Sequence, residues 1–94
     1  MAARKDFVVG IDLGTTHSAI AWSPKGREAV EILPVPQLVG PGEVSALPLL
    51  PSAIYLPGPG ELPEGATRLP WGERPWVVGE WARRLGARIP SRLV

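Results

Sequence analysis

The first third of the chain alternates large apolar residues with smaller or polar ones, which is the two-residue period of a β-strand. Residues 17–22 (HSAIAW) and 29–33 (AVEIL) are two further runs that suit a pleated surface, and residues 24–26 (PKG) supply a turn between them. These patterns predict a three-stranded antiparallel meander over residues 6–33. One face of its first strand carries Phe7, Val9, Ile11 and Leu13.

Prolines dominate the middle of the chain. Ten of the twelve prolines lie between residues 34 and 75, and each removes a backbone donor that a central strand needs. We therefore predict a proline-rich excursion over residues 34–75 that is mostly loop. Residues 52–56 (SAIYL) are the exception, because they suit a short strand. Pro51 and Pro57 on either side favour an edge position for it.

The end of the chain predicts a brief strand at residues 76–78 and a helix at residues 80–85 (EWARRL). Glu80 lies in the first turn, where the helix dipole favours negative charge, and Arg84 follows it four residues later in the order that favours an ion pair. Gly86 is predicted to cap the helix. The apolar stripe of the helix consists of Trp81 and Leu85.

Composition and charge narrow the possible functions. Of the 94 residues, 45% are hydrophobic and 20% charged, which is too apolar for an obligately disordered tail. The net charge of +1 is too small to neutralise several phosphates of a nucleic acid, so we expect no nucleic-acid partner. The chain has no cysteine, and His17 is its single histidine, which excludes cysteine and multi-histidine metal sites.

Neither a membrane span nor an export signal is expected from the sequence. The longest uncharged stretch, residues 44–60, contains four prolines, which would break a membrane-spanning helix. Arg4 and Lys5 precede a short apolar run, but that run holds only five residues between Asp6 and Asp12. We therefore expect a cytoplasmic protein with no membrane partner.

The segment that carries chemistry is GIDLGTT, residues 10–16, at the end of the first predicted strand. Gly14 allows a tight turn in which successive backbone N–H groups bind an anion, and Thr15 and Thr16 add hydroxyl donors. Asp12 would repel a bare phosphate, so its position suits a hydrated Mg²⁺ ion between carboxylate and phosphate. The residues therefore suit a phosphate-binding turn with a magnesium ion.

The same residues also suit a plain hairpin whose turn and strand-end aspartate satisfy only local hydrogen bonds, and the two interpretations stay open at this point. The segment is not a Walker P-loop, which ends in Gly-Lys-Ser/Thr. Nor is it a Rossmann fingerprint, which needs three spaced glycines and a following helix.

Three stretches resemble a known family. VVGIDLGTTHSAIAW, residues 8–22, resembles the first phosphate motif of the actin-like ATPase superfamily, in the DLGTT form of DnaK-type (heat-shock protein 70 family) chaperones and some sugar kinases. LPSAIYL and VVGEWARRLGARIP resemble later segments of the chaperones. The intervening residues 32–52 are longer and richer in proline than in the standard chaperone and resemble a divergent bacterial branch. The resemblance covers about residues 6–94.

This resemblance implies a site and a fold. Asp12 would help to hold hydrated Mg²⁺, while Gly14, Thr15, Thr16 and the backbone of His17 would bind the β and γ phosphates of ATP or ADP. Residues 1–94 would form the N-terminal fragment of a nucleotide-binding domain. That fragment would be an incomplete ribonuclease H-like α/β lobe, with exposed apolar surface where later elements are missing. Its parts would be a β-meander (6–33), a proline-rich excursion (34–75) and a strand and helix segment (76–94).

The implied activity belongs to a longer protein. In the family, ATP hydrolysis is coupled to the binding of unfolded polypeptides, assisted by J-domain and nucleotide-exchange co-chaperones, in protein folding and the stress response. The family's catalytic lysine follows the proline equivalent to Pro90, whereas the lysines of this chain are Lys5 and Lys25. We therefore expect the isolated chain neither to bind ATP tightly nor to hydrolyse it.

Two alternatives remain open. A carbohydrate kinase of the same superfamily would use the same loop to position ATP for transfer to a sugar. An actin-like filament protein, or a non-catalytic interaction module, would keep the hairpin without turnover.

Other conspicuous side chains favour structural roles. The four tryptophans suit core packing better than a stacking surface, because basic residues are not interleaved with them. The helix arginines are expected to form a solvated face. His17, with no second histidine or cysteine, is expected to serve the loop rather than a metal. These residues are Trp22, Trp71, Trp76 and Trp81, and Arg83, Arg84 and Arg88.

Overall fold

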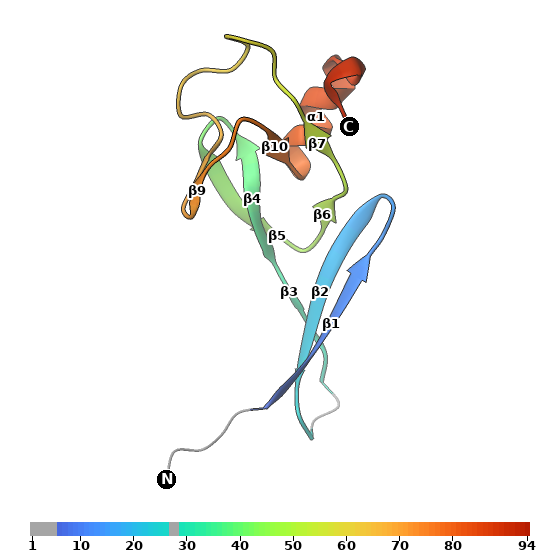
Figure 1. Cartoon of the computed structure of the whole chain (residues 1–94). Coiled ribbons are helices and arrows are strands. Elements are labelled where there is room, and N and C mark those ends of the chain that lie inside the picture. The colour runs from blue at the N-terminus through green and yellow to red at the C-terminus, as the bar shows by residue number, and fades with distance from the viewer. Residues whose placement is uncertain (1–5, 27–28) are drawn as a thin grey trace.

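The computed structural model describes residues 6–26 and 29–94. It is an α/β structure with mostly antiparallel strands and one α-helix. A long N-terminal hairpin extends away from a second part that carries the helix and several short strands (Figure 1). We call residues 35–94 the body. Among the described residues, no helix is long and apolar enough to cross a membrane.

The N-terminal sheet confirms the predicted meander. β1 (Phe7–Leu13) pairs antiparallel with β2 (His17–Pro24) along its whole length, from Phe7 opposite Pro24 to Leu13 opposite Ser18. β3 (Glu31–Leu33) pairs with the other edge of β2 and is shorter than the predicted run of residues 29–33. β6 (Leu50–Pro51) also pairs with β2, close to the turn of the hairpin. The sheet therefore has β2 at its centre and β1 at one edge.

The prediction that residues 34–75 are mostly loop is wrong for residues 35–47, and a second short hairpin interrupts the loop near its end. β4 (Val35–Gly40) and β5 (Glu43–Leu47) form an antiparallel hairpin, and β8 (Arg68–Leu69) pairs with β9 (Gly72–Glu73). Pro36 lies inside β4, opposite Ala46. A two-stranded sheet leaves one side of each strand unpaired, so a proline on that side removes no ladder bond.

Two short predicted strands exist and pair with each other. β7 (Ile54–Tyr55) and β10 (Val77–Val78) are antiparallel, and each is shorter than its sequence pattern indicated. The edge position predicted for residues 52–56 is wrong, because the other side of β7 bonds to the C-terminal residues. Tyr55 forms a β-bridge with Leu93, the Leu56 N–H donates to the Arg92 carbonyl at 2.9 Å, and the Val94 N–H donates to the Ile54 carbonyl at 2.8 Å.

The helix extends further than predicted. α1 runs over Glu80–Arg88, so Gly86 lies inside it and the prediction that Gly86 caps it is wrong. A side chain at residue 86 would begin 2.7 Å from the Leu93 side chain, which follows a short 3-10 helix, η1 (Pro90–Arg92). Glycine at residue 86 therefore leaves room for the Leu93 side chain to pack against the helix, and it does not end the helix.

The hydrophobic core lies in the body and not in the N-terminal hairpin. It joins β4, β7, β10 and α1, with part of the β7–β8 connection. Trp81 is 7% exposed, which agrees with the apolar stripe predicted for the helix. The buried apolar residues are Leu38, Ala53, Tyr55, Ala66, Val77, Trp81 and Ala82.

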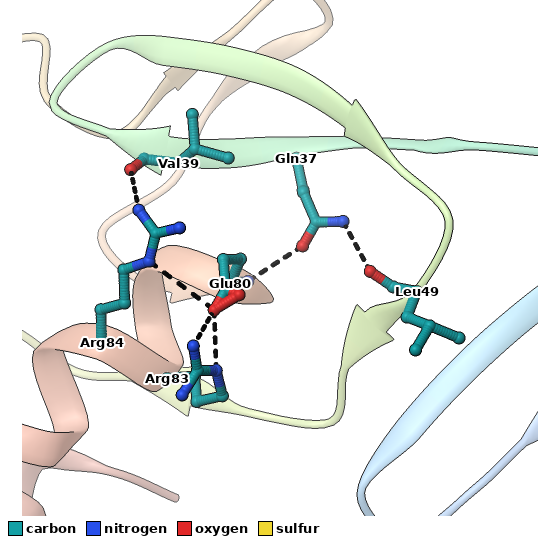
Figure 2. A network of polar contacts seen from close by, with 6 residues as sticks. All are labelled: Gln37, Val39, Leu49, Glu80, Arg83 and Arg84. Carbon is teal, nitrogen blue, oxygen red and sulfur yellow. Dashed lines mark hydrogen bonds and ion pairs between the residues drawn. The ribbon is translucent and has the colours of Figure 1, made fainter.

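Gln37 is the buried polar residue that organises this core (Figure 2). Its amide nitrogen donates to the carbonyls of Val35 (3.2 Å) and Leu49 (3.0 Å), and its amide oxygen accepts the first N–H of the helix, from Glu80, at 2.9 Å. That N–H would otherwise lack a partner within the helix. Gly79, with φ of 93°, makes the turn that brings this amide to Gln37.

The predicted charge pair on the helix is confirmed. Glu80 pairs with Arg84 (3.7 Å) and accepts a hydrogen bond from Arg83 (2.7 Å), while Arg84 also donates to the carbonyl of Val39 at 3.3 Å (Figure 2). Arg83, Arg84 and Arg88 are exposed, as expected for a solvated face.

A second polar cluster anchors the β7–β8 connection. The Tyr55 hydroxyl donates to Glu61, whose carboxylate also accepts the Gly58 N–H at 2.8 Å and lies 3.8 Å from Arg92. The hydrogen bond from Tyr55, followed by that from Gly58, lowers the pKa of Glu61 below its usual value near 4.5. The same contact raises the pKa of Tyr55, so its hydroxyl remains a donor at neutral pH.

This cluster predicts an acid-sensitive component of stability. A carboxyl whose pKa is lower in the folded state stabilises the fold above its unfolded pKa, and this contribution is lost as the pH falls through the folded value. The free energy of unfolding should therefore decline below about pH 4.5, and Glu61→Gln should flatten that decline and reduce stability at pH 7. Urea unfolding at several pH values measures both effects. Glu64→Gln, at an exposed position of the same connection, is the matched control; an equal change in both variants would contradict the assignment.

The prediction that all four tryptophans pack in the core is only partly correct, because Trp81 is buried there and the other three are not. Trp22 packs edge-on against Phe7, with ring centroids 5.3 Å apart, on the hairpin. Trp71 and Trp76 are 64% and 41% exposed, which contradicts the prediction that they lie in the core. They line a groove of about 320 Å³ in the body, together with Arg74.

Candidate phosphate-binding loop

The predicted phosphate-binding residues form the turn between β1 and β2. Gly14, Thr15 and Thr16 lie between the strands, and the Gly14 N–H donates to the carbonyl of His17 at 2.9 Å. A side chain at residue 14 would clash with that same carbonyl oxygen. The bend therefore requires glycine, for reasons of space rather than of a left-handed backbone.

Ser52 holds the turn from the body. Its hydroxyl donates to the Gly14 carbonyl at 2.8 Å, and its N–H donates to the Thr16 carbonyl at 2.9 Å. The neighbouring Pro51 pairs with His17 as part of β6. Two carbonyl oxygens of the turn are thus satisfied by protein donors. Among the described residues, the N–H groups of Thr15 and Thr16 donate no hydrogen bond, which leaves them available to an anion.

Asp12 lies at the side of this turn, as the sequence predicted. It is the second-last residue of β1, opposite Ala19, and its side chain is exposed. Within residues 6–26 and 29–94 it makes no hydrogen bond or ion pair, and no group of three or more acidic or histidine side chains there could enclose a metal. One carboxylate fits a Mg²⁺ ion that keeps most of its water ligands and binds phosphate at the same time.

His17 starts β2 and is exposed. Its Nδ1 lies 3.3 Å from the Thr16 hydroxyl, so the imidazole orients one of the loop's own donors. Whether that nitrogen donates or accepts depends on the tautomer. This contact agrees with a role within the loop.

The sequence predicted which residues form the turn, but it did not predict the hydrogen bonds from Ser52 that hold the turn in place. The contact between Ser52 and Gly14 joins residues 38 positions apart. The only signal for it was the resemblance of LPSAIYL to a chaperone segment, which identified the segment without its partner.

Comparisons with known proteins match the chain over a limited region. A segment of 35 residues is 63% identical to the chaperone protein DnaK of Thermotoga maritima and equally to that of Thermotoga petrophila. Part of this chain is similar to DnaK-type chaperones. The DnaK of Thermosipho melanesiensis is 56% identical over 34 residues. Each match covers 36% of this chain and 6% of the relative.

The DnaK similarity has no counterpart in the other comparisons. No protein-family model matches the chain, and no solved structure matches it. The similarity to DnaK is therefore limited to about a third of this chain, and the site residues depend on the geometry above.

Proposed function

We propose that this chain provides the first phosphate-binding loop of a DnaK-type ATPase. The observation that carries the proposal is the glycine bend at residues 14–16, where the Thr15 and Thr16 amides have no partner within residues 6–26 and 29–94 and Asp12 lies beside them. The 63% identity to DnaK over 35 residues supports the same conclusion. The hairpin sheet and helix would then be parts of an incomplete ribonuclease H-like lobe, from a divergent branch of the family.

In this proposal each residue has a defined chemical role. The amides of Thr15 and Thr16, the hydroxyls and the backbone of His17 hold the β and γ phosphate oxygens of ATP or ADP. Asp12 would accept hydrogen bonds from water ligands of Mg²⁺. The Mg²⁺ ion would neutralise part of the phosphate charge. Ser52 fixes the conformation of the turn, because its hydroxyl and N–H donate hydrogen bonds to the carbonyls of Gly14 and Thr16.

The loop alone should bind nucleotide weakly. About three charge-assisted hydrogen bonds of roughly 1.5–3 kcal/mol each must offset an association cost of about 4–15 kcal/mol. We therefore expect the isolated loop to bind nucleotide with a dissociation constant of about a millimolar or weaker. Hydrolysis, and its coupling to unfolded polypeptides and co-chaperones, would belong to a longer form of the protein.

Titration of the chain with Mg²⁺ and ATP, followed residue by residue in amide NMR spectra, tests the proposal. We expect chemical-shift changes at residues 12–17 and at Ser52, with millimolar apparent affinity. Asp12→Asn should remove the dependence on Mg²⁺, because the water ligands of the ion lose their charged acceptor. Glu64→Gln is the control, as an exposed carboxylate of the body.

Two outcomes would contradict this assignment. The first is a set of chemical-shift changes centred on residues outside 12–17 and Ser52. The second is a response to Mg²⁺ that is the same in the Asp12 and Glu64 variants.

A further inference from the structure

A short segment, residues 49–53, joins the phosphate-binding turn to the start of the helix, and we call it the connector. Ser52 of the connector holds the turn through its hydrogen bonds to the carbonyls of Gly14 (2.8 Å) and Thr16 (2.9 Å). The two residues before Ser52 form β6, which pairs with β2 beside the turn. The position of the donors that hold the turn therefore depends on the position of the connector.

β4 and the start of α1 hold the connector at both of its ends. At its first residue, the Leu49 carbonyl accepts a hydrogen bond from the Gln37 side chain at 3.0 Å (Figure 2). At its last residue, the Ala53 carbonyl accepts the Gly79 N–H at 3.0 Å. The Gln37 amide oxygen also accepts the Glu80 N–H at 2.9 Å. One buried side chain of β4 thus bonds both to the connector and to the first residue of the helix.

The packing around Gln37 leaves this side chain little freedom to move. Gln37 is 3% exposed. A side chain at residue 79 would begin 2.5 Å from the Gln37 amide oxygen and 2.8 Å from the Leu50 side chain, so glycine is needed where β4, the connector and α1 meet. A buried donor or acceptor that loses its partner is destabilising. Loss of the Gln37 amide should therefore displace the connector rather than leave its first carbonyl unpaired.

We propose that Gln37 is a positioning residue for the phosphate-binding turn and acts through the connector. Gln37 fixes Leu49 relative to the helix, and Ser52, three residues later, then meets the carbonyls of the turn. The turn keeps the conformation in which the Thr15 and Thr16 N–H groups are free for an anion. The role in phosphate binding rests on the proposed function, whereas the coupling between Gln37 and the turn is measurable without nucleotide.

The competing explanation is a turn that keeps its conformation by itself. β1 and β2 pair along their whole length, and a hairpin of this kind is specified by local residues. A change at residue 37 would then alter the body and leave the turn as it is. The two explanations differ in whether a substitution on β4 reaches residues 14–17.

Gln37→Met tests the coupling in the whole chain without nucleotide, because methionine is of similar size but has no amide donor or acceptor. We expect changed NMR chemical shifts at residues 14–17. Exchange of the Ser52 N–H, which donates to the turn, should become about tenfold faster or more. Leu38→Val, at the next residue of β4, is the control, since Leu38 packs in the core and makes no side-chain hydrogen bond. It should leave the shifts of the turn unchanged.

Ser52→Ala tests the same coupling from the other end, because a coupling between two sites acts in both directions. Ser52 is exposed, so this variant should fold even where Gln37→Met does not. We expect it to shift the side-chain amide resonances of Gln37 and the Glu80 N–H. Ser91→Ala, at an exposed serine of η1, should shift neither.

Three results would overturn the inference. The first is a set of shifts in Gln37→Met that is confined to the body. The second is an equal change of the turn in Leu38→Val, and the third is a Gln37 amide that does not respond to Ser52→Ala. Failure of the chain to bind Mg²⁺ and ATP would count against the proposed function and would leave these readouts unchanged.

Discussion

Trp81→Ala is expected to destabilise the body strongly. The indole is the largest side chain of the core and packs where α1 meets the short strands. Removing a buried tryptophan typically costs about 3–5 kcal/mol. A small domain has about 5–15 kcal/mol in total, so much of its stability would be lost. Urea unfolding followed by the helical circular dichroism signal measures the change.

Trp71→Ala is the matched control for this experiment. Trp71 is 64% exposed and lies on the same body, outside the core. Its replacement should change stability by no more than about 0.5 kcal/mol. A loss as large as that of Trp81→Ala would mean that the groove lined by Trp71 and Trp76 is a packed part of the core.

Gly14→Ala is expected to open the turn of the N-terminal hairpin. The added methyl group would meet the His17 carbonyl, which now accepts the Gly14 N–H. Relieving an overpacked contact of this kind costs about 1–3 kcal/mol. Each 1.4 kcal/mol is a factor of ten, so exchange of the bonded β1 amides should accelerate about tenfold or more. Amide hydrogen exchange measures the change at Val8, Gly10 and Asp12.

Gly10→Ala separates this effect from the general consequences of replacing a strand glycine. No other element lies within 4 Å of a methyl group at residue 10, so the variant should keep the exchange rates of the parent. Core amides of the body should change little in either variant, because the core contains no residue of the hairpin. Equal acceleration in both variants would contradict the clash at Gly14.

Local patterns predicted those elements whose partners are close in the sequence. The period-two alternation of β1 and the turn residues after it specify a hairpin without any distant contact. Glu80 and Arg84 could be paired from their spacing alone, because residues four apart share a helix face. The exposure of apolar side chains on the hairpin was also predicted.

The errors arose where a distant contact decides the structure. Pro36 argued against a strand, but β4 and β5 form a separate two-stranded sheet in which one side of each strand needs no donor. Gly86 appeared to end the helix, whereas Leu93 packs against it from beyond the helix end. Neither the isolated sheet nor the returning C-terminal residues leave a periodic signal in the sequence.

For the candidate site, the sequence by itself determined which residues form the turn. Glycine, two threonines and a neighbouring aspartate are local chemistry, and their order is sufficient to predict a tight bend at residues 14–16, although the same residues suit both a phosphate-binding turn and a plain hairpin. Only the tertiary structure decided which groups of that bend are free. Ser52 reaches it from 38 residues away and occupies two carbonyl oxygens, while the Thr15 and Thr16 amides keep no partner among the described residues. Hydrogen-bond satisfaction depends on every element that approaches a group, and such approaches are set by the packing of the whole chain.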